Sequence, residues 1–156
     1  MRLEQIFRME LINADLSSKT KTEALTELVN TINRSGFKLN SSSVIEILQQ
    51  RESLGSTGIG DGVAIPHGKI PALDDLIVVF GRSTEGIAYD ALDGKPVHLF
   101  FLLLAPENST GQHLKVLARI SKMLKIADFR KMLFIAKSQS DLYKIITDQD
   151  NACILN

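Results

Sequence analysis

Apolar residues recur at intervals of three and four along the first third of the chain, which is typical of helices with one buried face. The longer stretch covers residues 18–36, where Ser18 or Thr20 can cap the start and Gly36 can end the helix. The shorter stretch covers residues 40–50 and begins with serines that suit a cap. We therefore predict two helices before the middle of the chain.

The middle of the chain changes to short, continuous apolar runs, which are typical of buried strands. Residues 77–80 are β-branched and aromatic, and residues 87–89 suit a short strand. The strongest strand pattern covers residues 97–105 and is closed by Pro106. A shorter apolar run over residues 63–65 ends a glycine-rich stretch.

Helical spacing returns in the last third, with a long helix capped by Ser109 or Thr110 and shorter helices over residues 129–136 and 141–147. Helices, then strands, then helices predict an α/β fold in which helices layer a sheet. The 156 residues contain no internal repeat or long linker. We therefore predict one domain over residues 1–148 and a flexible tail over residues 149–156.

Composition narrows the classes of protein that fit. Lysine and arginine together number 18, as do aspartate and glutamate, so the net charge of zero favours neither a nucleic-acid nor an anionic-membrane partner. The most apolar stretch, residues 99–105, is far shorter than the roughly 20 residues of a membrane span. The single cysteine, Cys153, cannot form an intrachain disulfide and favours the reducing cytoplasm.

The stretch GSTGIGDGVAIPHGK, residues 55–69, holds five glycines in fifteen residues. Such a loop permits close backbone approach, and its amides can form an anion-binding concavity. The spacing does not match the Walker pattern, because Val63 stands where its first glycine belongs and Ile70 follows Lys69. The dinucleotide pattern fails as well, so we expect neither ATP nor NAD as a cofactor.

Three histidines, His67, His98 and His113, are candidates for chemistry. The chain has no HExxH or CxxC spacing and no serine in a GxSxG elbow, so we expect neither a metal site nor a nucleophilic triad. His67 stands between Pro66 and Gly68 at the end of an apolar run, where a neutral imidazole can offer one nitrogen as a nucleophile. On spacing alone, an ordinary hydrogen-bonded loop histidine explains the same pattern.

Two other side chains suit an anion. His113 falls in the first turn of the predicted long helix, where the helix dipole favours a neutral ring and bound anions. Arg51 ends a predicted helix just before the glycine-rich stretch, and a guanidinium suits bidentate phosphate contact. Taken alone, each is more often an ordinary surface residue.

The block RESLGSTGIGDGVAIPHGK, residues 51–69, resembles the active-site signature of phosphotransferase-system IIA domains of the fructose/mannitol class. The similarity is strongest to nitrogen-regulatory IIA proteins, and it extends through residues 86–106 and 111–121 over nearly the whole chain. This resemblance implies an α/β sandwich with a mixed five-stranded sheet and helices on both faces.

The resemblance also implies roles for individual residues. His67 matches the histidine that is phosphorylated through Nε2, His113 matches a second histidine that helps hold the phosphoryl group, and Arg51 matches an arginine beside the active histidine. Ser56, Thr57 and the neighbouring backbone are expected to complete the phosphoryl pocket. No role carries over to His98.

By the same resemblance, the phosphoryl donor is a histidine phosphocarrier protein (HPr or NPr), and no cofactor is expected. The main expectation is a nitrogen-regulatory switch that binds target proteins differently in its two phosphorylation states. The alternative is a sugar-specific IIA component that passes the phosphoryl group to a IIB domain. A pure binding module would have lost site residues, whereas Arg51, His67 and His113 are all present.

Apolar residues beside the loop are candidates for contact with such a partner protein. Ile59, Val63 and Ile65 flank the glycines closely. Core packing is the favoured explanation for Val63 and Ile65.

Overall fold

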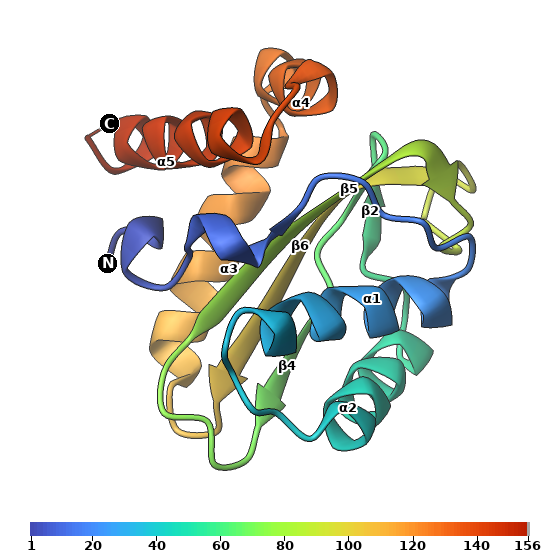
Figure 1. The fold of residues 1–156 in the computed structure, drawn as a ribbon, viewed down its shortest axis with the longest axis vertical. Helices are drawn as coiled ribbons and strands as arrows, with labels where there is room; N and C mark the ends of the chain where they lie inside the picture. Colours follow the sequence, from blue (N-terminus) through green and yellow to red (C-terminus); the bar gives the residue numbers. More distant parts are fainter. Residues whose placement is uncertain (156) are drawn as a thin grey trace.

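The computed structural model describes residues 1–155, which form a mixed sheet covered by helices. Figure 1 shows the two long strands, β5 and β6, crossing the centre of the molecule. The strand order is β1-β5-β6-β3-β2, and β4 also pairs with β6. The strands are β1 (Ile12–Asn13), β2 (Gly58–Gly60), β3 (Val63–Ala64), β4 (His67–Ile70), β5 (Ile77–Ile87) and β6 (Val97–Pro106).

Helices cover both faces of this sheet, with α1 and α2 on one side and α3 on the other (Figure 1). The helices are α1 (Lys21–Arg34), α2 (Ser41–Ser53), α3 (Thr110–Leu124), α4 (Ala127–Ile135) and α5 (Gln139–Leu155), preceded by short 3-10 helices at Leu3–Gln5 and Met9–Leu11. The predicted α/β class is confirmed. The sheet of the described residues has six strands rather than the five that the resemblance implies, and its two-residue strand β1 pairs with β5.

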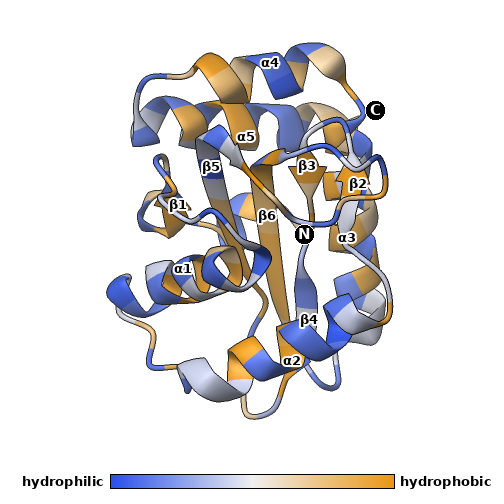
Figure 2. Cartoon of the chain, turned by 90° about the vertical axis from the view of Figure 1, so that its right-hand side faces the viewer, coloured by the Kyte–Doolittle hydropathy of each residue, from blue (hydrophilic) through white to orange (hydrophobic). Residues whose placement is uncertain are grey.

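Strand β6 is the centre of the core. Every residue of VHLFFLLLAP except His98 is buried, and β6 pairs antiparallel with β5 and parallel with β3 and β4. Figure 2 shows that most of β6 is hydrophobic. This burial on both faces explains why the predicted strand at residues 97–105 has no polar alternation.

Caps define the ends of the first two helices. Thr20 Oγ1 accepts from the Glu23 amide at 3.3 Å, and the Glu23 carboxylate accepts from the Thr20 amide at 3.2 Å. This capping box selects Thr20 over Ser18 as the cap. Gly36, with φ of +101°, follows the end of α1, and Asn40 caps α2.

The carboxyl-terminal segment differs from its predicted flexibility. Residues 149–155 are the last turns of α5, and Asp150 is only 1% exposed. Its carboxylate accepts from the Leu3 amide at 2.7 Å and from Arg119 Nε at 2.5 Å. These partners lie far away in the sequence, so local composition gave no sign of them; Asn156 lies outside the described residues.

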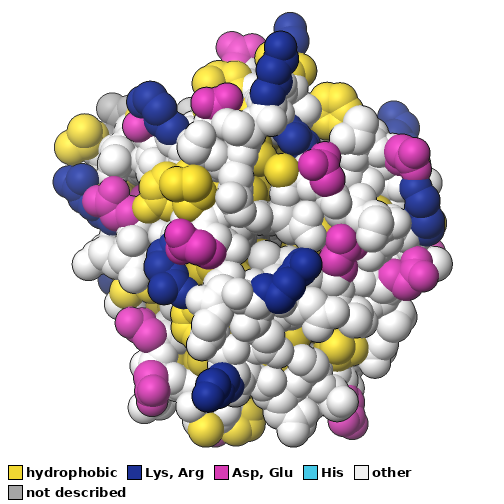
Figure 3. All heavy atoms as spheres, in the orientation of Figure 1, with side chains coloured by type: hydrophobic (Ala, Val, Ile, Leu, Met, Phe, Trp, Pro, Cys, Tyr) yellow, Lys and Arg dark blue, Asp and Glu magenta, His cyan; other side chains and the backbone are white. Residues whose placement is uncertain are grey.

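The surface carries both signs of charge. Figure 3 shows acidic and basic side chains interspersed over one face of the molecule, and no histidine of the described residues appears there. Among residues 1–155, no helix combines the length and the apolar character needed to cross a bilayer.

Candidate phosphoryl-transfer site

The glycine-rich loop joins α2 to β4 and contains the small antiparallel pair β2–β3. Its turn places Gly60, Asp61 and Gly62 at φ of +99°, +57° and +74°, a left-handed run in which glycine avoids steric strain. Position 58 requires glycine for a different reason, because a Cβ there would lie only 2.8 Å from the Ala91 Cβ. The glycines therefore let the backbone fold tightly ahead of β4, which begins with His67.

His67 is the first residue of β4 and lies opposite Leu103 of β6. Its Nδ1 is 2.9 Å from the Ile65 carbonyl oxygen, and its ring is half-buried. Because a carbonyl only accepts, Nδ1 carries the proton in this contact. Nε2 therefore keeps its lone pair in the neutral ring, and this nitrogen is the potential nucleophile.

Burial and charge together lower the pKa of His67 below its ordinary value. Desolvation is the larger cause, and the Arg51 guanidinium adds to it, while the bond to the Ile65 carbonyl and the charge of Glu52 oppose the shift. The ring is therefore neutral at pH 7, which is the protonation state that nucleophilic attack requires.

His113 meets His67 edge-on in the first turn of α3. The two ring centroids are 5.6 Å apart, with an interplanar angle of 83°. Burial, and then the nearby His67 and Lys69, lower the pKa of His113, so this ring is neutral as well. Its Nδ1 is enclosed without a hydrogen-bond partner among residues 1–155. Since a buried N–H without an acceptor is especially unfavourable, the proton belongs on Nε2, which becomes a hydrogen-bond donor.

Two cationic side chains lie around the pair of histidines. Arg51 Nη1 donates to the Gly55 carbonyl at 2.9 Å, so its guanidinium lies against the start of the loop. Lys69 follows His67 by two residues on β4, which places both side chains on one face of the strand. Its Nζ donates to Thr110 Oγ1 at 2.7 Å, at the start of α3. The alternation of a strand was the signal that could have identified Lys69 from the sequence.

Ser56 and Thr57 direct their hydroxyl groups into the protein. Ser56 Oγ donates to the Tyr89 carbonyl at 3.2 Å and accepts from the Gly58 amide at 3.0 Å. Thr57 donates to the Glu52 carboxylate through both its hydroxyl and its amide, the latter at 3.0 Å. The hydroxyl donors of both side chains are thus engaged in shaping the loop.

Glu52 is the functional candidate that sequence reasoning missed. Its carboxyl group is buried at the end of α2, directly under the loop, with 4% of the side chain exposed. It continues the four-residue spacing of Val44 and Leu48, the buried positions of this helix. A glutamate at a position where the helical pattern calls for an apolar residue is the signal that could have revealed it.

His98 does not join the site. It lies on β6, where its Nδ1 is 2.9 Å from the Ser83 carbonyl oxygen and its ring packs edge-on against Phe134, with centroids 5.4 Å apart. Within the described part of the chain, no three histidine, cysteine, aspartate or glutamate side chains are arranged to hold a metal ion.

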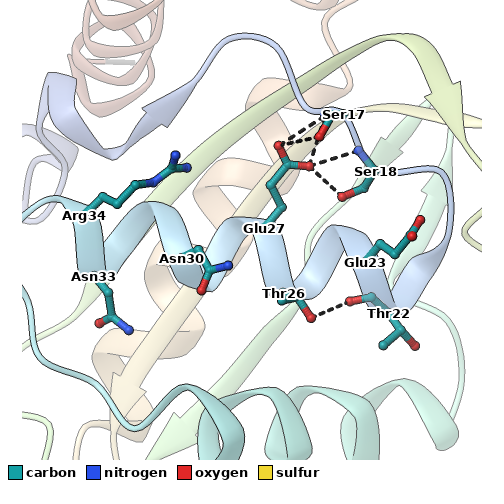
Figure 4. Close-up of a pocket in the computed structure, with 9 residues that line it drawn as sticks. All are labelled: Ser17, Ser18, Thr22, Glu23, Thr26, Glu27, Asn30, Asn33 and Arg34. Atoms are coloured by element: carbon teal, nitrogen blue, oxygen red, sulfur yellow. Dashed lines mark hydrogen bonds between the residues drawn. The ribbon is translucent and has the colours of Figure 1, made fainter.

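A polar groove of about 690 Å³ lies elsewhere, along α1. Figure 4 shows that the Glu27 carboxylate within it is bound to Ser17 and Ser18, whose amides donate at 3.0–3.1 Å. Burial raises the pKa of Glu27, but these hydrogen bonds outweigh it and the net pKa is lowered. The carboxylate is used to fasten the preceding segment to α1, and no candidate site residue lines this groove.

The residues around His67 form an arrangement suited to a dianionic group. Figure 2 shows β4 between α2 and α3, with β2 above it. The His67 and His113 rings meet edge-on, the charges of Arg51 and Lys69 act on these two rings, and Lys69 reaches Thr110 in the amino-terminal turn of α3 that also carries His113. Such groups stabilise the charge spread over phosphoryl oxygens during transfer.

Comparisons with known proteins agree with this chemistry. Residues 5–149 match the family model described as "Phosphoenolpyruvate-dependent sugar phosphotransferase system, EIIA 2". A nitrogen regulatory protein of Bradyrhizobium diazoefficiens is 40% identical over 146 residues, covering 94% of this chain and 95% of the relative. The fructose-specific EIIABC component of Bacillus subtilis is 36% identical over 150 residues, which are 96% of this chain but 24% of that protein.

A solved structure is similar as well. The crystal structure of the nitrogen regulatory protein IIA-Ntr from Neisseria meningitidis superposes with a TM-score of 0.86 at 36% identity. The match covers 93% of this chain and 99% of that one.

Proposed function

The chain belongs to the EIIA type 2 family of the phosphoenolpyruvate-dependent sugar phosphotransferase system, and from this premise we propose that it carries a phosphoryl group on His67. The observation that carries the proposal is the state of the His67 ring. Nδ1 is tied to the Ile65 carbonyl at 2.9 Å, burial keeps the ring neutral by lowering its pKa, and Nε2 is left as the free nucleophile.

The transfer exchanges one nitrogen–phosphorus bond for another. The lone pair of His67 Nε2 forms a bond to phosphorus, while the bond to the donor imidazole breaks and its electron pair returns to the donor ring. The proton on His67 Nδ1 stays in place, and the Ile65 carbonyl stabilises the positive charge that the ring gains. A phosphohistidine donor needs no nucleotide site, which fits the absence of nucleotide motifs in the sequence.

The surrounding groups stabilise the negative charge of the phosphoryl group during transfer. His113 offers its Nε2 proton from the first turn of α3, while Arg51 and Lys69 supply positive charge at the loop and at β4. Ser56 and Thr57 act on the pocket by holding the loop backbone in place, because their own hydroxyl donors are engaged. Positioning and electrostatics of this kind supply most of the catalysis in phosphoryl transfer.

The proposed donor is a histidine phosphocarrier protein (HPr or NPr), and the proposed role is a nitrogen-regulatory switch. Two relatives that match nearly the whole chain carry the name nitrogen regulatory protein or IIA-Ntr. A phosphoryl group on His67 adds negative charge and acceptor oxygens to the surface, which is enough to change the affinity of a target protein. The single cysteine fits the cytoplasm as the place of this exchange.

The alternative is a IIA component that passes the phosphoryl group to a sugar-specific IIB domain. It is favoured by the fructose-specific name of the B. subtilis protein, which matches the chain over 150 residues. The same chemistry at His67 serves both roles. Incubating the phosphorylated protein with a fructose-type IIB domain separates them, because only the transport role predicts loss of the phosphoryl group to that domain.

Phosphotransfer followed by intact mass tests the common step. The protein is mixed with phosphoenolpyruvate, enzyme I and a phosphocarrier protein, alongside His67→Ala and His98→Ala. His98 is the matched control, since its Nδ1 also contacts a main-chain carbonyl at 2.9 Å. We expect an acid-labile phosphoryl adduct on the wild type and His98→Ala only. An adduct on His67→Ala, or none on the wild type, overturns the proposal.

A further inference from the structure

We propose that Glu52 is the positioning residue of this site, acting on His67 through a relay of main-chain hydrogen bonds. The part of this inference that concerns phosphoryl transfer rests on the proposed function. Its structural part, control of the His67 tautomer, concerns the unphosphorylated protein.

The Glu52 carboxylate is bound from three directions under the loop. Oε1 accepts from the Thr57 amide at 3.0 Å and lies 3.1 Å from Lys21 Nζ, and Oε2 accepts from the Thr57 hydroxyl. Buried carboxylates are costly unless such partners satisfy them. The two bonds to Thr57 fix one residue of the loop against the end of α2.

From Thr57 the relay continues to the nucleophile. The Thr57 carbonyl accepts from the Ile65 amide at 3.1 Å, and the Ile65 carbonyl accepts from His67 Nδ1 at 2.9 Å. A displacement of Thr57 is therefore transmitted to the one acceptor that holds the proton on Nδ1. Glu52 fixes which nitrogen of His67 is free without touching the ring.

Neighbouring side chains hold the relay in one position. Tyr89 is fully buried, its hydroxyl lies 3.2 Å from Thr57 Oγ1, and its ring packs edge-on against Phe100. Lys21, at the first turn of α1, places its ammonium 4.8 Å from the centre of the Tyr89 ring. These contacts join α1, the core and the loop at Glu52, so they leave the loop little freedom to shift.

Three variants separate positioning from a purely structural role. Glu52→Ala removes the acceptor of both Thr57 donors. Glu52→Gln keeps an oxygen for the Thr57 amide, and Lys21, whose side chain is 21% exposed, can turn its ammonium to water. Glu46→Ala is the matched control, because Glu46 is an exposed glutamate on the same helix.

The first readout is the imidazole ¹⁵N spectrum of His67 in the folded, unphosphorylated protein at pH 8. We expect a single Nδ1–H tautomer in the wild type, Glu52→Gln and Glu46→Ala, and a mixture of tautomers in Glu52→Ala. The second readout is the rate of phosphorylation by the phosphocarrier, which we expect to fall about 100-fold in Glu52→Ala, as for a misplaced reacting group. Glu52→Gln should restore most of that rate.

The two readouts make failure of either idea recognisable. A folded Glu52→Ala protein with an unchanged tautomer overturns the positioning role, even if its melting temperature is lower. A Glu52→Gln protein as impaired as Glu52→Ala overturns the hydrogen-bond relay. If the wild type shows the Nδ1–H tautomer but accepts no phosphoryl group, the proposed function fails while the relay stands.

Discussion

Two regions of the molecule contain buried charges: the glycine-rich loop at the end of α2, and the far end, where α4, α5 and the start of the chain meet. The charges have different partners in the two regions. Under the glycine-rich loop, the Glu52 carboxylate accepts from Thr57, which leads onward to the site. Beneath α4, the buried Arg82 donates to the Ala14 and Leu133 carbonyls at 3.1 and 3.0 Å, and to further carbonyls at the end of that helix. One charge fixes the loop that leads to His67, the proposed nucleophile, and the other binds the carbonyls at a helix end.

The far end also contains the buried Asp150, which joins α5 to α3 and to the start of the chain. Its two oxygens bind Arg119 Nε and the Leu3 amide. Arg119 Nη2 is enclosed without a hydrogen-bond partner in the described part of the chain, although its charge is matched by Asp150. At the site, by contrast, His113 Nδ1 is the atom that finds no hydrogen-bond partner among residues 1–155, and it belongs to a neutral ring beside His67. The comparison indicates that the charges at the far end serve stability, whereas the neutral His113 ring lies beside His67, where we propose that it serves phosphoryl transfer.

The largest effect on the comparison is expected from Asp150→Ala. It leaves the Arg119 guanidinium and the Leu3 amide in the interior without their acceptor, so we expect a loss of about 3–5 kcal/mol in the free energy of unfolding. Urea unfolding measures this loss. The rate of phosphorylation of the folded fraction should be unchanged. A slower phosphoryl transfer in that fraction would contradict the assignment of Asp150 to stability alone. Asp148→Ala, at an exposed pair with Lys144, is the control and should leave stability unchanged.

Arg51→Ala tests the comparison at the glycine-rich loop. Loss of the guanidinium removes a stabilising charge beside the phosphoryl group, so we expect phosphorylation to slow by about 100-fold with little change in stability. The pKa of His67 should also rise toward its ordinary value, because Arg51 contributes to lowering it. The acidic limb of the pH–rate profile then moves to higher pH.

Arg51→Lys is the control for that experiment. It keeps the charge and loses the planar fork, so the pH profile should stay closer to wild type while the rate recovers only in part. A wild-type pH profile in Arg51→Ala would contradict the assigned electrostatic role.

His113→Leu should separate transfer from stability most clearly. Removing the ring loses one donor to the phosphoryl group, for which we expect a rate about tenfold lower. It also removes a buried nitrogen that has no hydrogen-bond partner within residues 1–155, so the free energy of unfolding should stay level or rise by about 1 kcal/mol. Paired rate and urea measurements check this. A large loss of stability would place His113 with the structural groups of the far end.

The smallest effect concerns pH and stability. The pKa values of His67 and His113 are lowered in the folded protein, mainly by burial. The unfolded chain therefore takes up protons first as the pH falls below about 6.5, and the free energy of unfolding decreases. The slope cannot exceed about 1.4 kcal/mol per pH unit for each ring. Urea titrations between pH 7.5 and 5 should give a shallower slope in His67→Ala than in wild type.

Elements of the fold were predictable from the sequence where they depend on neighbouring residues, and unpredictable where they depend on residues far away in the chain. The helical spacing in residues 18–36 and the apolar run at residues 97–105 are local patterns, and each became an element close to its predicted bounds. The short strands β1, β2 and β4 have few residues and take their form from pairing with distant partners. Asp150 is the clearest case, because its burial depends on Leu3 at the other end of the chain.

The site shows the same limit. The family signature predicted His67, His113 and Arg51 as site residues, and the structure brings these three together. What the signature could not provide was the direction of each side chain. Thr57 turns inward to Glu52 rather than toward the proposed phosphoryl group, a choice that is set by packing of the loop on α2.

The central claim is that Nε2 of His67 is the phosphoryl acceptor, because the loop holds the proton on Nδ1. The most direct test is ³¹P and ¹⁵N spectroscopy of the phosphorylated, ¹⁵N-histidine-labelled protein, with His113→Leu and His98→Ala used to assign the ring signals. The account predicts phosphorus bonded to Nε2 of His67, with Nδ1 still protonated and bound to the Ile65 carbonyl. Phosphorus on Nδ1 of His67, or on either of the other histidines, would contradict it.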